Sequence, residues 1–114
     1  MIPSIISADC RTFASGAAIA ENIRVKLSSG VLQVAGSTER SIGTTEAAVA
    51  IGATVSVRLR TSRGTVLMTA GGNINAGQDV YASSNGRVAA SGTVFEGTAL
   101  TGASIGETIE VVRA

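Results

Sequence analysis

The feature that most constrains this chain is a repeat within it. The seventeen residues from Ile42 to Arg58 recur 54 residues later with six identities, and Val55 is matched conservatively by Ile109. A weaker match joins the Ser28-Ser29-Gly30 turn to Ser83-Ser84-Asn85-Gly86. Coincidence between two hairpins of similar composition is the alternative explanation. The identical pairs are Gly43 and Gly97, Thr44 and Thr98, Ile51 and Ile105, Gly52 and Gly106, Thr54 and Thr108, and Val57 and Val111.

The repeat predicts two related units, at about residues 22–60 and 77–114. We expect the units to face each other across a pseudo-twofold axis and to bury one shared core. The pairs Ile51/Ile105 and Val57/Val111 are then expected at equivalent buried sites.

Each unit has the pattern of short β-strands. Apolar and charged residues alternate from Ile23 to Leu27 and again from Thr54 to Arg60, which gives a strand one apolar and one polar face. The pair Asn85-Gly86 is a strong hairpin signal, because a type I′ turn needs positive φ at both central residues. With 14 glycines and 3% aromatic residues, the chain is predicted to be all-β: a small antiparallel sandwich or barrel of about eight strands.

The first twenty residues lack this alternation of apolar and polar residues. The sequence predicts an N-terminal arm at 1–20 ahead of a single β domain at 21–114. Its apolar side chains either pack on the domain or bind a partner, since a free tail is usually polar. The arm is our candidate contact element for a partner, and its candidate contact residues are Ile2, Pro3, Ile5, Ile6 and Phe13.

Composition argues against most catalytic and cofactor chemistry. The chain has no histidine, and its single cysteine, Cys10, can form neither an intrachain disulfide nor a cysteine zinc cluster. Its only lysine, Lys26, lies inside a strand pattern, which argues against a lipoyl or biotinyl carrier domain. We therefore expect no enzyme activity, no cofactor and no metal.

Charge and hydropathy also limit the partners. The net charge of +1 and the few aromatic residues argue against nucleic-acid binding. Arg58, Arg60 and Arg63 form the densest basic cluster, which fits strand-face or interface charges or, less readily, contact with an acidic partner. The longest wholly apolar run, Ala47 to Ile51, is too short to span a membrane, and the N-terminus does not look like a signal peptide. A soluble protein made in the cytoplasm is the expectation.

The order of several motifs resembles a known family. From Gly52 onward these motifs are Ala76-Gly77-Gln78-Asp79-Val80-Tyr81, Asn85-Gly86, Gly97-Thr98-Ala99-Leu100 and Gly106-Glu107-Thr108-Ile109-Glu110-Val111. In this order they resemble the small capsid decoration, or cement, proteins of tailed bacteriophages. This resemblance implies a non-enzymatic protein that binds the outside of a phage capsid in many copies and stabilises it, usually as a homotrimer. Its partners would be the major capsid protein and itself, and its location the virion exterior after synthesis in the host cytoplasm. In that case the arm, with its five candidate contact residues, is our candidate capsid-contact element.

A second function remains open from the sequence alone. A ligand- or sugar-binding adhesion domain of a phage tail or fibre would have a similar composition, with Tyr81 as its only plausible aromatic platform. The small side chains favour the cement interpretation, because a domain of this size buries only about two-thirds of its chain surface. Oligomerisation or docking on a shell would add the missing burial.

Overall fold

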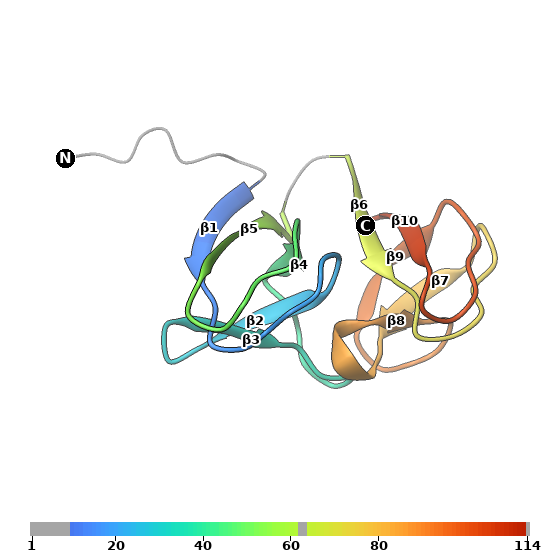
Figure 1. The fold of residues 1–114 in the computed structure, drawn as a ribbon. Coiled ribbons are helices and arrows are strands. Elements are labelled where there is room, and N and C mark those ends of the chain that lie inside the picture. The colour runs from blue at the N-terminus through green and yellow to red at the C-terminus, as the bar shows by residue number, and fades with distance from the viewer. Residues whose placement is uncertain (1–9, 62–63, 114) are drawn as a thin grey trace.

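In the computed structural model the chain forms two lobes side by side, each built on a five-stranded antiparallel sheet (Figure 1). The structure describes residues 10–61 and 64–113. Within these residues the all-β antiparallel fold class is confirmed, with ten strands instead of about eight. The N-terminal sheet has the order β1-β5-β4-β2-β3 and the C-terminal sheet the order β6-β10-β9-β7-β8. The strands are β1 (Cys10–Ala14), β2 (Arg24–Ser28), β3 (Val31–Val34), β4 (Gly43–Thr45), β5 (Thr54–Leu59), β6 (Thr65–Thr69), β7 (Asp79–Ala82), β8 (Val88–Ala89), β9 (Phe95–Ala99) and β10 (Thr108–Val112).

The internal repeat is confirmed by the strand order and by backbone hydrogen bonds. β1 to β5 occupy the same places in the first sheet as β6 to β10 in the second. The isolated antiparallel bridge Ile19–Val49 of the first lobe corresponds to Ile74–Ala103 of the second. Each repeat therefore begins one strand earlier than the sequence indicated, at β1 and β6 instead of near residues 22 and 77.

Part of the expected arm belongs to the first lobe. β1 pairs along its whole length with β5, from Cys10 opposite Arg58 to Ala14 opposite Thr54. Phe13 is half-buried and packs against the core of that lobe. The boundary of the arm at residue 20 is thus revised, because residues 10–14 form an edge strand. Only residues 1–9 of the expected arm lie outside the described residues.

Each lobe has its own hydrophobic core, so the expectation of one shared core is wrong. The reason is the curl of each sheet: its ends approach each other at the parallel bridges Ser15–Leu32 and Ala70–Val88. Inward-facing side chains therefore meet within a lobe and not between lobes. The buried apolar residues are Ile19, Ile23, Val25, Leu32, Val49, Val55 and Val57 in the first core, and Val66, Met68, Ala70, Ile74, Val80, Val88, Ala99, Ile109 and Val111 in the second.

The paired residues of the repeat are equivalent but not all buried. Val57 and Val111 are both completely buried, as predicted. Ile51 and Ile105 are 71% and 64% exposed, so their predicted burial is wrong. Each isoleucine precedes a glycine with positive φ, Gly52 at +83° and Gly106 at +86°. These turns connect β4 to β5 and β9 to β10 at the lobe surface, where the core does not reach.

The predicted turn at Asn85-Gly86 is present. Asn85 has φ 58° and Gly86 has φ 70°, the positive values that a type I′ turn requires. The amide of Arg87 donates to the carbonyl of Ser84 at 3.2 Å and closes the short 3₁₀ turn η1 (Ser84–Gly86). Its counterpart in the first lobe, between β2 and β3, is Ser29-Gly30, again with positive φ at both residues.

Separate cores predict independent losses of stability. Val57→Ala and Val111→Ala should each lower the free energy of unfolding by about 2 kcal/mol, because each removes buried methyl groups from a packed site. The double variant should lose the sum of the two, since the residues lie in different cores. Urea unfolding of the four proteins measures this, with Ile51→Ala as a surface control. A coupling above about 1 kcal/mol would contradict separate cores.

Candidate interaction surfaces

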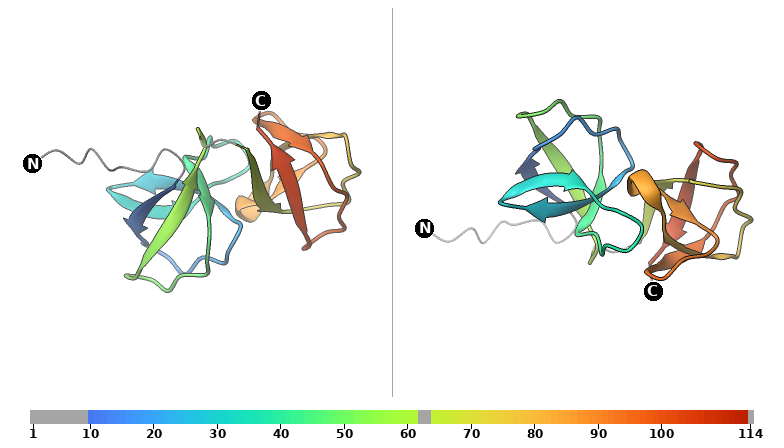
Figure 2. Two further views of the ribbon diagram at one scale, coloured as in Figure 1. Left: turned by 90° about the horizontal axis from the view of Figure 1, so that it is seen from above. Right: turned by 90° about the horizontal axis from the view of Figure 1, so that it is seen from below.

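The two lobes meet through charged and polar groups. Figure 2 shows them side by side, with the turn between β7 and β8 against the first lobe. Arg24 on β2 is the centre of this contact, and its side chain is fully buried. It was placed by sequence on the polar face of an alternating strand. That face is covered by the second lobe, so the guanidinium lies between the lobes instead of in solvent.

The Arg24 guanidinium links both lobes by hydrogen bonds. Its Nε donates to the carbonyl of Arg87 at 3.0 Å, and one Nη donates to the carbonyl of Ser83 at 2.8 Å. Other bonds run to the carbonyls of Ala35, Gly36 and Glu39 in its own lobe. Such a fork of donors is available only to arginine. Burial lowers the pKa of Arg24, while Glu96 acts in the opposite direction.

Glu96 supplies the negative charge for this contact. Its carboxylate is buried and accepts from Arg24 at 3.3 Å and from Arg60 at 2.8 Å. Arg60 also donates to the carbonyl of Phe95 at 3.1 Å. Glu96 reaches the other lobe from β9, where the pairing with β7 shifts register between Val80 and Tyr81. The two buried charges are thus paired across the lobes.

A further arginine lies beside this pair. The side chain of Arg113 is only 8% exposed, and the Arg113 Nη1 atom lies 3.7 Å from a Glu96 carboxylate oxygen. None of its guanidinium nitrogens has a hydrogen-bond partner in the described part of the chain. Burial lowers the pKa of Arg113 to about 10, against the opposing effect of Glu96.

The two repeats contact each other through different surfaces. Gly86, at the turn of the second lobe, lies against the first: an added Cβ would collide with Ile23 Cγ2 and lie 2.9 Å from the Arg24 carbonyl oxygen. Its counterpart Gly30 would have no atom within 4 Å of a Cβ. Likewise Arg24 is buried, while its counterpart Asp79 is exposed. The contact is therefore heterologous, and each lobe keeps one of the two surfaces uncovered.

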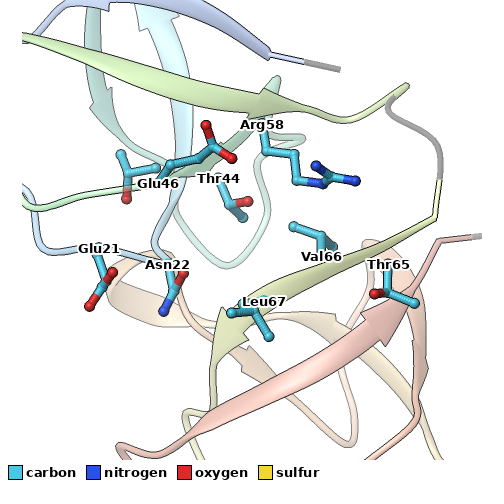
Figure 3. A pocket seen from close by; sticks show the side chains of 9 residues that line it. Glu21, Asn22, Thr44, Glu46, Arg58, Thr65, Val66 and Leu67 are labelled. Atoms are coloured by element: carbon cyan, nitrogen blue, oxygen red, sulfur yellow. The ribbon is translucent and has the colours of Figure 1, made fainter. Parts of the chain in front are cut away.

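A cleft of about 320 Å³ opens between the lobes (Figure 3). Thr44 and Arg58 line it from the first lobe, and Val66 and Leu67 line it from β6. Beside it the Thr69 amide donates to the carbonyl of Asn22 at 3.1 Å and joins the lobes again. The remaining lining residues are Glu21, Asn22, Thr45, Glu46 and Thr65. In the described ranges no three His, Cys, Asp or Glu residues gather as a metal-binding group.

The candidate contact residues fall into two groups. Ile2, Pro3, Ile5 and Ile6 lie outside the described residues. Phe13 lies on β1, with the Arg11 guanidinium carbon 5.7 Å from its ring centroid. The predicted basic cluster is divided as well, because Arg60 joins the lobe contact, Arg58 lines the cleft and Arg63 is not described.

No helix among the described residues is long and apolar enough to cross a membrane.

Sequence reasoning missed Arg24 and Glu96, the buried pair that joins the lobes. Arg24 alternated regularly with apolar neighbours, and Glu96 follows the apolar pair Val94-Phe95 and precedes Gly97. One signal was available: at the position that repeats Glu96, the first unit has Ile42. A charged residue that replaces an apolar one between repeats marks a site where the two units differ in what they contact.

The described residues define a small all-β protein of two lobes without α-helices. The sequence model of the family described as phage cement protein matches residues 10–114. The chain belongs to the phage cement protein family.

A solved structure has the same fold. The head fiber gp8.5 N base of bacteriophage phi29 superposes with a TM-score of 0.80, with 92% of each chain covered and 15% sequence identity. At this identity the likeness shows the fold alone. A search of curated proteins finds no match.

The buried Arg24–Glu96 contact predicts that a conservative substitution at either residue lowers the stability of the protein. Glu96→Gln should destabilise the protein by about 3 kcal/mol, because Arg24 would remain buried without a counter-charge. Arg24→Lys should also destabilise it, since lysine offers three donors to the carbonyls that arginine joins. Thermal and urea unfolding measure both. Glu39→Gln is the control, because the side chains of the Lys26–Glu39 pair are 33% and 40% exposed, so this pair should matter much less than the fully buried one. Equal effects of Glu96→Gln and Glu39→Gln would contradict this view of the contact.

Proposed function

We propose that this chain binds the outside of a phage capsid in many copies and stabilises it, without catalysis. The observation that carries the proposal is the match of the cement-protein family over residues 10–114. The shared fold with a phage head-fiber base supports a role on the phage head. Major capsid protein is the proposed partner, and the capsid exterior the proposed location.

The physical character of the chain fits this role. Near-zero net charge allows many copies to pack closely, because highly charged neighbours would repel one another. Many weak contacts on one shell also add up, since each further contact of an attached oligomer forms at high effective concentration. We further propose that the chain assembles as a homotrimer.

We propose that residues 1–9 form the attachment element. They lead directly into β1, which is an edge strand of the first sheet. A segment next to an edge strand can add a strand to a partner's sheet, with backbone hydrogen bonds for affinity and alternate side chains for specificity. Ile2, Pro3, Ile5 and Ile6 are the proposed capsid contacts, whereas Phe13, the fifth candidate, is partly buried against the core of the first lobe.

The adhesion-domain alternative gains no support from the geometry. The ring of Tyr81, its one aromatic platform, packs edge-on against Phe95 with 5.8 Å between ring centroids.

Removal of residues 2–9 should weaken binding to the capsid without affecting folding. Deletion of residues 2–9 should leave the unfolding transition unchanged, because β1 is kept. The same deletion should lower the occupancy of phage heads at least about tenfold, since the backbone pairing and the apolar contacts are both lost. Occupancy is counted by electron microscopy of undecorated heads incubated with the protein, and head stability by the temperature of DNA release.

Ile105→Ser is the matched control, because it removes an exposed isoleucine from the other lobe. Full occupancy by the deletion variant would show that residues 2–9 are not the anchor. Failure of the unaltered protein to bind or stabilise heads would overturn the cement function itself.

A further inference from the structure

Three arginines surround one carboxylate at the contact between the lobes. Arg60 Nη1 lies 2.8 Å and Arg113 Nη1 lies 3.7 Å from the same carboxylate oxygen of Glu96. Arg24 donates to the other oxygen at 3.3 Å. In the described part of the chain, the ion pairs of these three arginines all involve Glu96. With three positive charges and one negative charge, two positive charges are left over, and burial reduces their screening by water and salt.

Arg113 is the least satisfied of the three arginines. The guanidinium groups of Arg24 and Arg60 also donate to backbone carbonyl oxygens. The three guanidinium nitrogens of Arg113 are buried, and none of them has a hydrogen-bond partner among the described residues. Burial lowers the pKa of Arg113 only to about 10, so the group stays charged at neutral pH. A buried charge without hydrogen bonds is strongly unfavourable, so this cluster lacks an acceptor.

The fold itself does not require two of these charges. At the positions that repeat Arg113 and Glu96, the first lobe has Leu59 and Ile42. Both lobes nevertheless have the same strand order. The strands therefore form equally well with apolar residues at these two positions, and the charges serve a contact that only the second lobe makes.

A small oxyanion has the chemistry that this cluster lacks. Guanidinium groups form paired hydrogen bonds with the oxygens of carboxylates and phosphates, and these bonds are stronger than bonds to neutral acceptors. Arg60 and Arg113 approach one oxygen of Glu96, so their two positive charges repel each other, and an anion between them would remove this repulsion. The cluster meets solvent at Arg60, whose side chain is 21% exposed.

We propose that Arg60 and Arg113 together bind a small oxyanion beside Glu96, where the two lobes meet. Arg60 belongs to the first lobe, where its amide donates to the carbonyl of Ile42 at 2.7 Å, and Arg113 follows β10 of the second. The anion thus links the lobes and adds to the Arg24–Glu96 contact. Its source is either a free ion such as inorganic phosphate or a carboxylate of a shell protein. The site in solution does not depend on the proposed cement function.

Inorganic phosphate is the probe in solution. The unfolding temperature of the full chain should rise by at least about 3 °C up to about 20 mM phosphate and then level off, because a ligand that binds only the folded state stabilises it. Sodium chloride keeps the ionic strength constant. Titration calorimetry of the unaltered chain should show one saturable site. Absence of saturable phosphate binding would overturn the inference.

Arg113→Leu is the test variant, because the first lobe has leucine at this position. Without phosphate it should unfold at a higher temperature than the unaltered chain, since a buried charge without an acceptor is removed. It should also lose the response to phosphate. Arg11→Leu is the matched control: it removes an exposed arginine on β1 and should keep the response. Equal responses of the two variants, or a lower unfolding temperature of Arg113→Leu without phosphate, would contradict the proposed site.

Binding to undecorated phage heads distinguishes the two sources of the oxyanion. If a shell carboxylate fills the site, phosphate should compete with head binding, and Arg113→Leu should lower the occupancy at least about tenfold. If the anion is free in solution, neither change should lower the occupancy. Both results support the oxyanion site. An unaltered chain that binds phosphate but not heads contradicts the cement function and leaves the site standing.

Discussion

The structure depends on one buried ion pair, between Arg24 and Glu96. Each lobe closes its own core, so no continuous apolar layer holds the lobes together. Their relative position is set by directional bonds from the Arg24 guanidinium to carbonyls of both lobes and to the Glu96 carboxylate. Hydrogen bonds to charged groups are stronger than neutral ones, and their geometry allows few alternatives. The consequence is a defined arrangement of two lobes whose hydrophobic cores are separate.

The internal repeat explains both the similarity and the asymmetry of the lobes. Duplication keeps the strand order, the paired bridges and the turn isoleucines. Because the lobes meet through different surfaces, equivalent positions experience different surroundings. Arg24 and Asp79 are the clearest case: one forms the lobe contact and the other is exposed. The same asymmetry leaves the Ser29-Gly30 turn of the first lobe without the contact that Gly86 makes in the second.

For a cement protein, this construction assigns maintenance of the fold and contact with neighbouring chains to different residues. The cores and the Arg24–Glu96 pair maintain the lobes, and the surfaces that remain can vary without loss of the fold. Ile51 and Ile105 show that exposed apolar residues persist at turns where no core requires them. We expect contact with neighbouring chains, and not internal packing, to determine the residues at these surfaces.

The sequence by itself determined the all-β class, the repeat and the main turn. Strand alternation and positive-φ turns are local properties, so Val57, Val111 and Asn85-Gly86 could be placed from their neighbours along the chain. The tertiary structure alone decided that there are two cores, that β1 belongs to the first lobe, and that Ile51 and Ile105 are exposed. It also decided that Arg24 and Glu96 are buried together. These outcomes depend on sheet curvature and on contacts between residues as far apart as Arg24 and Glu96, which alternation along the chain does not encode.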